Sequence, residues 1–244
     1  MKRIVGIYII VFLSSITTML AQNFEGSLSY SVDFELTPKM KEKGMTKEIV
    51  MEIMSKDGGF SKVINYWYKK DNYLLEVPNT GSKSIYIGEK NTLYSFTKEN
   101  PNTIIATDVT INLDNQMYGN KPTVSVEDTD EVILGKKCKR VTISWSNGTT
   151  EYYFSPGFLP MDAKLYKDFN HNMWNAYLEK SNALPLRIVK KGSNDYLTFI
   201  MNLQNIDETR VSKKEFDLPE MVIDELNSDF MPANQKAYTK ISKK

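Results

Sequence analysis

The stretch VTISWSNGTTEYYF, residues 141–154, decides the fold. Two runs rich in β-branched and aromatic residues flank Asn147-Gly148, a dipeptide that favours the positive φ angles of a two-residue type I′ turn. Such a turn between such runs predicts an antiparallel hairpin with one apolar and one polar face. The predicted cross-strand pairs on the apolar face are Val141 with Phe154, Ile143 with Tyr152 and Trp145 with Thr150.

The same alternation of apolar and polar residues occurs on both sides of this hairpin. It runs through residues 24–36, which predicts a half-buried strand. Further aromatic and β-branched runs are separated by polar turns of a few residues, whereas parallel neighbours would need crossovers of a dozen or more. The sequence therefore predicts a meander of antiparallel strands. Its other predicted strands are residues 63–68, 73–77, 84–87, 92–97, 186–189 and 196–206.

Two segments show helical spacing instead. In residues 37–54 a Thr-Pro pair suits the start of a helix and apolar residues follow at helical intervals, although a strand over residues 47–54 is an alternative. In residues 159–181 apolar side chains recur every four residues, which predicts a second helical region. The repeating side chains are Leu165, Phe169, Met173 and Tyr177.

The N-terminal residues 1–21 predict an export signal peptide. Lys2 and Arg3 precede an apolar run, and a Ser/Thr patch follows it and ends at Ala21. Cleavage after this residue would leave a mature chain with no stable membrane span, in the periplasm of a Gram-negative cell envelope or secreted. An uncleaved anchor is the alternative, because residues 4–24 carry no charge and are long enough to span a bilayer.

The remaining chain is predicted to be one domain. Because no internal repeat or low-complexity linker divides it, we expect a single domain over residues 22–220 and a C-terminal extension or tail over residues 221–244. Without Lys2 and Arg3 the 31 basic residues fall to 29, against 30 acidic residues. This balance suggests neither nucleic acid nor anionic lipid as a partner.

The reactive side chains argue against an enzyme. The single histidine, His171, lies between two asparagines and is interpreted as a solvated loop residue without a neighbouring nucleophile or zinc ligands. The acidic run at residues 127–131 is interpreted as a solvated turn, and the sequence has no glycine motif for a nucleotide cofactor. We therefore predict no catalytic residue, no metal and no cofactor. The single cysteine, Cys138, is predicted to be a buried, small apolar residue.

Four short motifs resemble those of one protein family. They are the opening Phe24-Glu25-Gly26 strand, the segment DTDEVILGKKCKRV at residues 128–141, Leu184-Pro185-Leu186 and Phe216-Asp217-Leu218-Pro219. Over residues 22–219 the chain resembles an exported Bacteroidetes-type family of unknown function that is similar to the lipoprotein carriers LolA and LppX. The resemblance implies an α+β fold, in which a curved antiparallel β-sheet forms a half-open β-barrel and helices cover its concave face. The charged insertion at residues 40–56 departs from the family and leaves open how that end of the sheet is covered.

The implied fold leads to two alternative functions. Because a bent sheet under helices often leaves an apolar pocket, the first is a non-enzymatic binding or carrier module for a lipid or acyl chain. The second is an envelope structural or assembly protein with a filled core, which would act through contacts with other envelope proteins. For the first function, the predicted cavity lining is Tyr30, Phe34, Trp145, Tyr152, Phe154, Phe169 and Met173.

Overall fold

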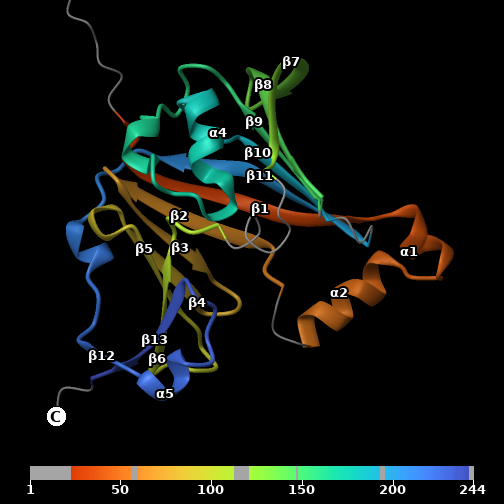
Figure 1. Cartoon of the computed structure of the whole chain (residues 1–244). Helices are drawn as coiled ribbons and strands as arrows, with labels where there is room; N and C mark the ends of the chain where they lie inside the picture. The colour runs from red at the N-terminus through yellow and green to blue at the C-terminus, as the bar shows by residue number, and fades with distance from the viewer. Residues whose placement is uncertain (1–22, 57–59, 113–120, 147, 193–195, 242–244) are drawn as a thin grey trace, which may run out of the picture.

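Thirteen strands of the described chain form one open sheet, and every neighbouring pair runs antiparallel, as predicted (Figure 1). This computed structural model describes residues 23–56, 60–112, 121–146, 148–192 and 196–241, so the predicted export signal lies outside the described residues. In order across the sheet, the strands are β12 (Met221–Ile223), β13 (Gln235–Lys240), β6 (Thr103–Asp108), β5 (Thr92–Phe96), β4 (Ser82–Ile87), β3 (Asn72–Val77), β2 (Val63–Lys69), β1 (Gly26–Leu36), β11 (Leu197–Asp207), β10 (Arg187–Gly192), β9 (Gly148–Phe154), β8 (Lys136–Trp145) and β7 (Thr123–Ile133).

The helices are short, and they do not form a layer over the sheet. The described residues contain four short α-helices, so the predicted LolA-like α+β fold, a half-open barrel with helices over its concave face, is wrong. No described helix is long and apolar enough to cross a bilayer. The α-helices are α1 (Pro38–Glu42), α2 (Lys47–Lys56), α4 (Trp174–Ser181) and α5 (Glu225–Ser228), and the 3-10 turns are η1 (Gly88–Lys90), η2 (Ala163–Tyr166), η3 (His171–Met173) and η4 (Lys213–Phe216).

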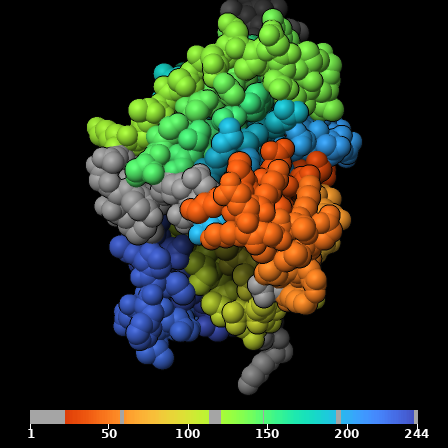
Figure 2. Space-filling model, turned by 90° about the vertical axis from the view of Figure 1, so that its right-hand side faces the viewer, coloured from red at the N-terminus to blue at the C-terminus, as the bar shows by residue number. Residues whose placement is uncertain are grey.

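Residues 37–54 form two helices rather than one. Gly44 follows the first helix with a φ of 74°, a left-handed conformation that ends it, and the alternative strand prediction is wrong because α2 lies there. In α2 only Val50 is buried, while Ile49 and Ile53 stay exposed. Figure 1 shows α1 and α2 to one side of the sheet, beyond the end of β1, and Figure 2 shows this segment in orange on the face toward the viewer. These two helices therefore do not cover the sheet.

Residues 159–181 form tight turns followed by one short helix. Asn172 and Met173 take left-handed φ angles of 52° and 55°, which interrupt a continuous α-helix. The predicted helical region is therefore divided among η2, η3 and α4. Tyr177 of α4 packs on the sheet, where its ring stacks on that of Tyr152 at a centroid distance of 4.4 Å.

The β8–β9 hairpin forms, but its register is shifted by two residues from the prediction. Val141 pairs with Tyr152 and Trp145 pairs with Gly148, so the three predicted pairs are wrong. An added Cβ at Gly148 would collide with the Lys191 carbonyl oxygen of β10, and its φ of 152° also favours glycine. The glycine is thus required as the first residue of β9. Because the shift is two residues, every side chain keeps its predicted face.

Three parts of the sheet extend beyond the predicted strands. The first is β6. The second is β7, which contains the acidic run at residues 127–131 that was interpreted as a turn, with a register shift between Asp128 and Val132. The third comes from residues 221–244, where the sequence suggested an extension or tail. This segment supplies β12 and β13 to the sheet, and β13 pairs with β6.

Apolar residues pack on both faces of the sheet. The face that carries Tyr86 and contacts α4 holds the larger core, and we call it the inner face. Cys138 belongs to this core and is buried, as predicted. Ile85 directly precedes Tyr86 on β4 and points to the opposite face, which we call the outer face. Val211 and Phe216 cover it there. Figure 1 shows the sheet bent, with β1, β10 and β11 across the middle and β3 to β6 below them.

Candidate functional site

A cavity of about 330 Å³ lies in the inner face of the sheet. It is partly open to solvent, and strands β1 to β5 and β9 to β11 contribute to its walls together with the segment around η3. Ligand cavities commonly measure roughly 300–1,000 Å³, so this volume is at the lower end of their range. Its aromatic lining residues are Tyr30, Tyr66, Tyr68, Tyr73, Tyr152, Phe169 and Trp174.

The aromatic rings form a continuous row of contacts along one wall. Tyr66 meets Tyr30 edge to face at 5.7 Å and stacks on Tyr68 at 5.9 Å between ring centroids. Tyr73 lies 6.1 Å from both Tyr66 and Phe169. Because each such pair contributes about 0.5–1.5 kcal/mol beyond area burial, the rings hold one another in place without a ligand.

Strand geometry explains why these rings share one face. Ile64, Tyr66 and Tyr68 alternate along β2, so all three point to the inner face. On β1, the Tyr30 hydroxyl donates a buried hydrogen bond of 2.7 Å to the Pro185 carbonyl oxygen. This bond satisfies the buried hydroxyl and ties β1 to the chain that leads into β10.

The segment at residues 169–174 forms one rim of the cavity. The backbone N–H groups of Asn170 and His171 both donate to the Val109 carbonyl oxygen, at 2.8 and 3.0 Å. The side-chain amide of Asn170 also donates to the Thr110 carbonyl oxygen at 2.8 Å. His171 is therefore half-buried in a fixed rim, which corrects its interpretation as a solvated loop residue.

One lysine among the described lining residues brings a positive charge to this cavity. Lys190 and His171 are lining residues, and no described lining residue has a carboxylate. Lys190 is exposed to solvent, yet the protein around it desolvates the ammonium and lowers its pKa. No carboxylate of the described residues forms an ion pair with it. The cavity thus combines apolar walls with an excess of positive charge.

Burial keeps the tyrosines of this wall neutral. Desolvation raises the pKa of Tyr66 to about 12. It raises the pKa of Tyr30, Tyr68 and Tyr73 well above the usual value, and neighbouring tyrosines add to the effect. At neutral pH these side chains offer hydroxyl groups and apolar rings to a ligand, and none acts as a phenolate base.

Three of the predicted lining residues lie in the cavity wall, and their contact with a ligand stays a prediction; they are Tyr30, Tyr152 and Phe169. The other four lie outside the described lining: Phe34, Trp145, Phe154 and Met173. Phe34 packs on Phe60, with ring centroids 5.6 Å apart, and Phe154 packs on Tyr177 at 6.3 Å. Trp145 and Met173 pack against the larger core.

Sequence reasoning missed several lining residues, among them Tyr66, Tyr68 and Lys190. The tyrosines alternate within a predicted strand, but Trp67 gives the opposite face of that strand an aromatic residue too. The pattern therefore does not show which face holds a cavity. Lys190 comes directly after the predicted strand at residues 186–189, where a lysine is expected to point to solvent.

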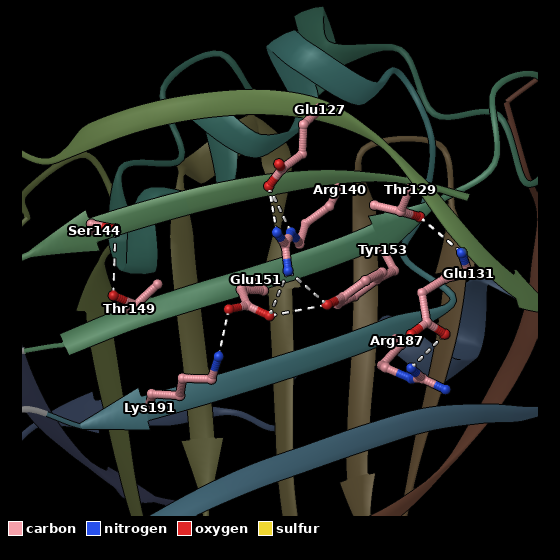
Figure 3. Close-up of polar contacts among 10 residues, drawn as sticks. All are labelled: Glu127, Thr129, Glu131, Arg140, Ser144, Thr149, Glu151, Tyr153, Arg187 and Lys191. Carbon is pink, nitrogen blue, oxygen red and sulfur yellow. Dashed lines mark hydrogen bonds and ion pairs between the residues drawn. The ribbon is translucent and has the colours of Figure 1, made fainter. Parts of the chain in front are cut away.

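The outer face of β8, β9 and β10 carries a network of ion pairs (Figure 3). Arg140 binds Glu127 at 2.6 Å and Glu151 at 3.6 Å, and Lys191 binds Glu151 at 2.6 Å. The Tyr153 hydroxyl donates to Glu151 at 3.1 Å and accepts from Arg140 at 3.2 Å. Burial raises the pKa of Glu151, but its contacts with Lys191, Tyr153 and Arg140 outweigh burial, and the net pKa is lowered. These groups satisfy one another and form a structural network.

Two further results bear on the chemistry of the site. Across the described ranges, no group of three or more His, Cys, Asp or Glu residues is arranged to hold a metal ion. No protein-family model and no curated protein matches the sequence. The resemblance to the exported family stays a prediction, and the function is therefore inferred from the geometry of the cavity.

Proposed function

We propose that this protein is a non-enzymatic binding or carrier module for a hydrophobic, lipid-like ligand. The observation that carries the proposal is the aromatic cavity of about 330 Å³ in the inner face of the sheet. A lipid or an acyl chain is the proposed ligand. Its proposed contact surface is the tyrosine wall, which consists of Tyr30, Tyr66, Tyr68 and Tyr73.

The composition of the walls supports an apolar chain. Besides the aromatic rings, Ile64, Leu75, Leu93, Ile188 and Met201 line the cavity. Each methylene group buried there contributes about 0.8 kcal/mol, so affinity grows with the length of chain inserted. The ring contacts that the wall makes within itself reduce the ordering that binding requires.

Free hydroxyl groups support a ligand that is not purely hydrocarbon. Tyr66, Tyr73 and Tyr152 line the cavity, and their hydroxyls have no hydrogen-bond partner among the described residues. These hydroxyls can bond to water in an empty cavity and to ester, carboxyl or phosphate oxygens of a ligand.

The predicted compartment supports a carrier. The export signal at residues 1–21 would deliver the protein to the periplasm or the exterior. A lipid-like molecule dissolves poorly in such an aqueous compartment because its apolar surface is unfavourable in water. A protein that encloses this surface would allow the ligand to move between membranes or to other proteins.

Native mass spectrometry of protein purified from its own envelope tests the proposal directly. We expect a fraction of the protein to carry an added mass that denaturation releases as an identifiable lipid. Spectra that repeatedly show only empty protein would overturn the proposal and would favour a filled domain that acts through its surface.

A pair of Ser84 variants tests whether the cavity is the binding site. Ser84 lines the cavity, whereas Ser95 does not, and their hydroxyl oxygens share one hydrogen bond of 3.0 Å. Ser84→Phe should fill the cavity and lower the affinity for a fluorescent fatty-acid probe by about tenfold or more. Ser84→Ala loses the same hydrogen bond without adding a ring and serves as the matched control. Equal affinities for the two variants would place the probe elsewhere on the protein.

A further inference from the structure

Two successive lysines of β10 lie in opposite surroundings. Lys191 points to the outer face and pairs with Glu151 at 2.6 Å. Lys190 points to the inner face, lines the cavity and has no ion-pair partner among the described residues. Alternation along one strand thus places one lysine in a network of carboxylates and the other beside apolar walls.

We propose that the ligand of this cavity is an anionic amphiphile, whose apolar chain lies against the tyrosine wall and whose carboxylate or phosphate group binds the Lys190 ammonium. This inference rests on the proposed function and adds the charge and the orientation of the ligand to it.

The wall is electrostatically complementary to an anion. Lys190 contributes a positive charge, and no described lining residue contributes a carboxylate. A cationic head group would meet repulsion there without any compensating negative charge. A neutral lipid would provide no ionic partner for the ammonium.

The desolvation of Lys190 supports the same conclusion. Protein around the ammonium removes part of its hydration, which is why its pKa is lowered. A bound anion would restore favourable interactions through a charge-assisted hydrogen bond, and such bonds are stronger than those between neutral groups. The side chain lines the cavity and is exposed to solvent, so a head group can reach it without a rearrangement of the sheet.

The β10 ladder orders the two ends of the ligand. Ile188 faces the cavity between Tyr152 and Met201 on the neighbouring strands, which makes this level of the wall apolar. Two residues further along, Lys190 lies between Thr150 of β9 and Phe199 of β11, so its ammonium adds a positive charge to the next level of the wall. The wall changes from apolar to charged along one strand, as an amphiphile changes from chain to head group.

Three probes with one chain and different head groups test this inference on the mature protein. Dodecanoic acid, dodecyl phosphate and dodecanol are titrated against the wild type, Lys190→Met and the control Lys191→Met. We expect the wild type to bind at least one of the two anions about ten- to a hundredfold more tightly than the alcohol. Lys190→Met should lose this preference and keep the affinity for dodecanol, whereas Lys191→Met should keep both.

The other outcomes contradict either this inference alone or the proposed function together with it. If the wild type binds dodecanol as tightly as both anions, or if Lys190→Met keeps the preference, the inference is overturned and the proposed function stands. If inorganic phosphate alone displaces dodecyl phosphate at equal concentration, the site binds a free anion, and the proposal of an amphiphilic ligand is overturned. If none of the three probes binds, the proposed function fails together with the inference. The preferred anion identifies the head group as carboxylate or phosphate.

Discussion

The two faces of β9 and β10 differ in whether their charged side chains have partners within the described protein. On the outer face, Glu151 and Lys191 pair with each other, and the Tyr153 hydroxyl exchanges hydrogen bonds with its charged neighbours. On the inner face, Tyr152 stacks on the α4 tyrosine, and Lys190 lies in the cavity wall without a carboxylate. The outer face therefore satisfies its charges internally, while the inner face keeps one charge available.

This difference shows where to look for function in the sheet. The outer network has the most ionisable groups, yet its groups are held by one another, and such networks are mainly structural. The inner face has few charges, but its lysine can be satisfied by something that the protein does not supply among its described residues. The number of charged residues is a poorer guide than whether each has a partner.

Alkaline pH should unfold the protein, because it ionises the buried tyrosines of the inner face. Burial raises the pKa of Tyr30, Tyr68 and Tyr177 well above the usual value of 10.0, and that of Tyr66 to about 12. In the unfolded chain these phenols ionise near pH 10.0, so the stability that they contribute is complete below this pH and is lost as pH rises through the folded-state values. We expect cooperative unfolding in this range. Circular dichroism should be lost over the pH range in which the buried tyrosines ionise; ionisation of all the tyrosines with unchanged circular dichroism would contradict the prediction.

Removal of one inner-face ring should have the largest effect of any single substitution considered. Tyr177 is fully buried, stacks on Tyr152 at 4.4 Å and donates a hydrogen bond of 2.8 Å to the Ala183 carbonyl oxygen. Tyr177→Ala should lower the free energy of unfolding by about 3–5 kcal/mol, because it leaves a cavity in the core. Urea unfolding measures the change. Phe230, which is 84% exposed, provides the control Phe230→Ala, expected within about 0.5 kcal/mol of wild type.

Loss of the central carboxylate of the outer network should have an intermediate effect. Glu151→Gln should lower the free energy of unfolding by about 1–3 kcal/mol at neutral pH, because Lys191 loses its ionic partner and Arg140 keeps Glu127 as its one remaining ionic partner among the described residues. The folded-state pKa of Glu151 is lowered, so its contribution is present above the unfolded value of 4.5 and is lost as pH falls through the folded value.

An unfolding series from neutral to acid pH checks this sign. The difference between Glu151→Gln and wild type should shrink as the pH falls, whereas a difference that stays constant in acid would show that the charge of Glu151 is not its source. Glu52→Gln is the matched control, because the Glu52–Lys56 pair on α2 is exposed and is expected to contribute only about 0.3–0.5 kcal/mol.

The strands of the sheet were predicted better than the helical segments, for physical reasons. Alternation over residues 24–36 is a local signal, and β1 lies there. The apolar repeat ending at Tyr177 is equally regular, but the left-handed φ angles of Asn172 and Met173 stop a helix, and spacing does not reveal them. β7 escaped detection because it is exposed along most of its length and its acidic run resembles a solvated turn, although these carboxylates form ion pairs with β8 and β10.

The candidate site was predicted only in part because a cavity depends on long-range register. Tyr30 and Tyr152 belong to strands that alternation identifies, and both lie in the cavity wall. Phe34 alternates in phase with Tyr30 but lies beyond the last residue of β1 that pairs with β2, where it packs on Phe60 instead. The position of a side chain along a strand thus decided its role, and this position depends on pairing with distant segments.

The smallest expected effect concerns stability alone, and it separates the two neighbouring lysines by sign. Lys191→Met removes an ion pair with a largely buried carboxylate and should destabilise the fold by up to about 1 kcal/mol. Lys190→Met removes a desolvated ammonium that has no carboxylate partner in the described chain, and its apolar stem is retained, so it should be neutral or stabilising by less than about 1 kcal/mol. Urea unfolding of the ligand-free proteins measures both. If Lys190→Met were the more destabilising variant, its ammonium would already be satisfied within the protein, and the contrast between the two faces of β10 would lose its basis.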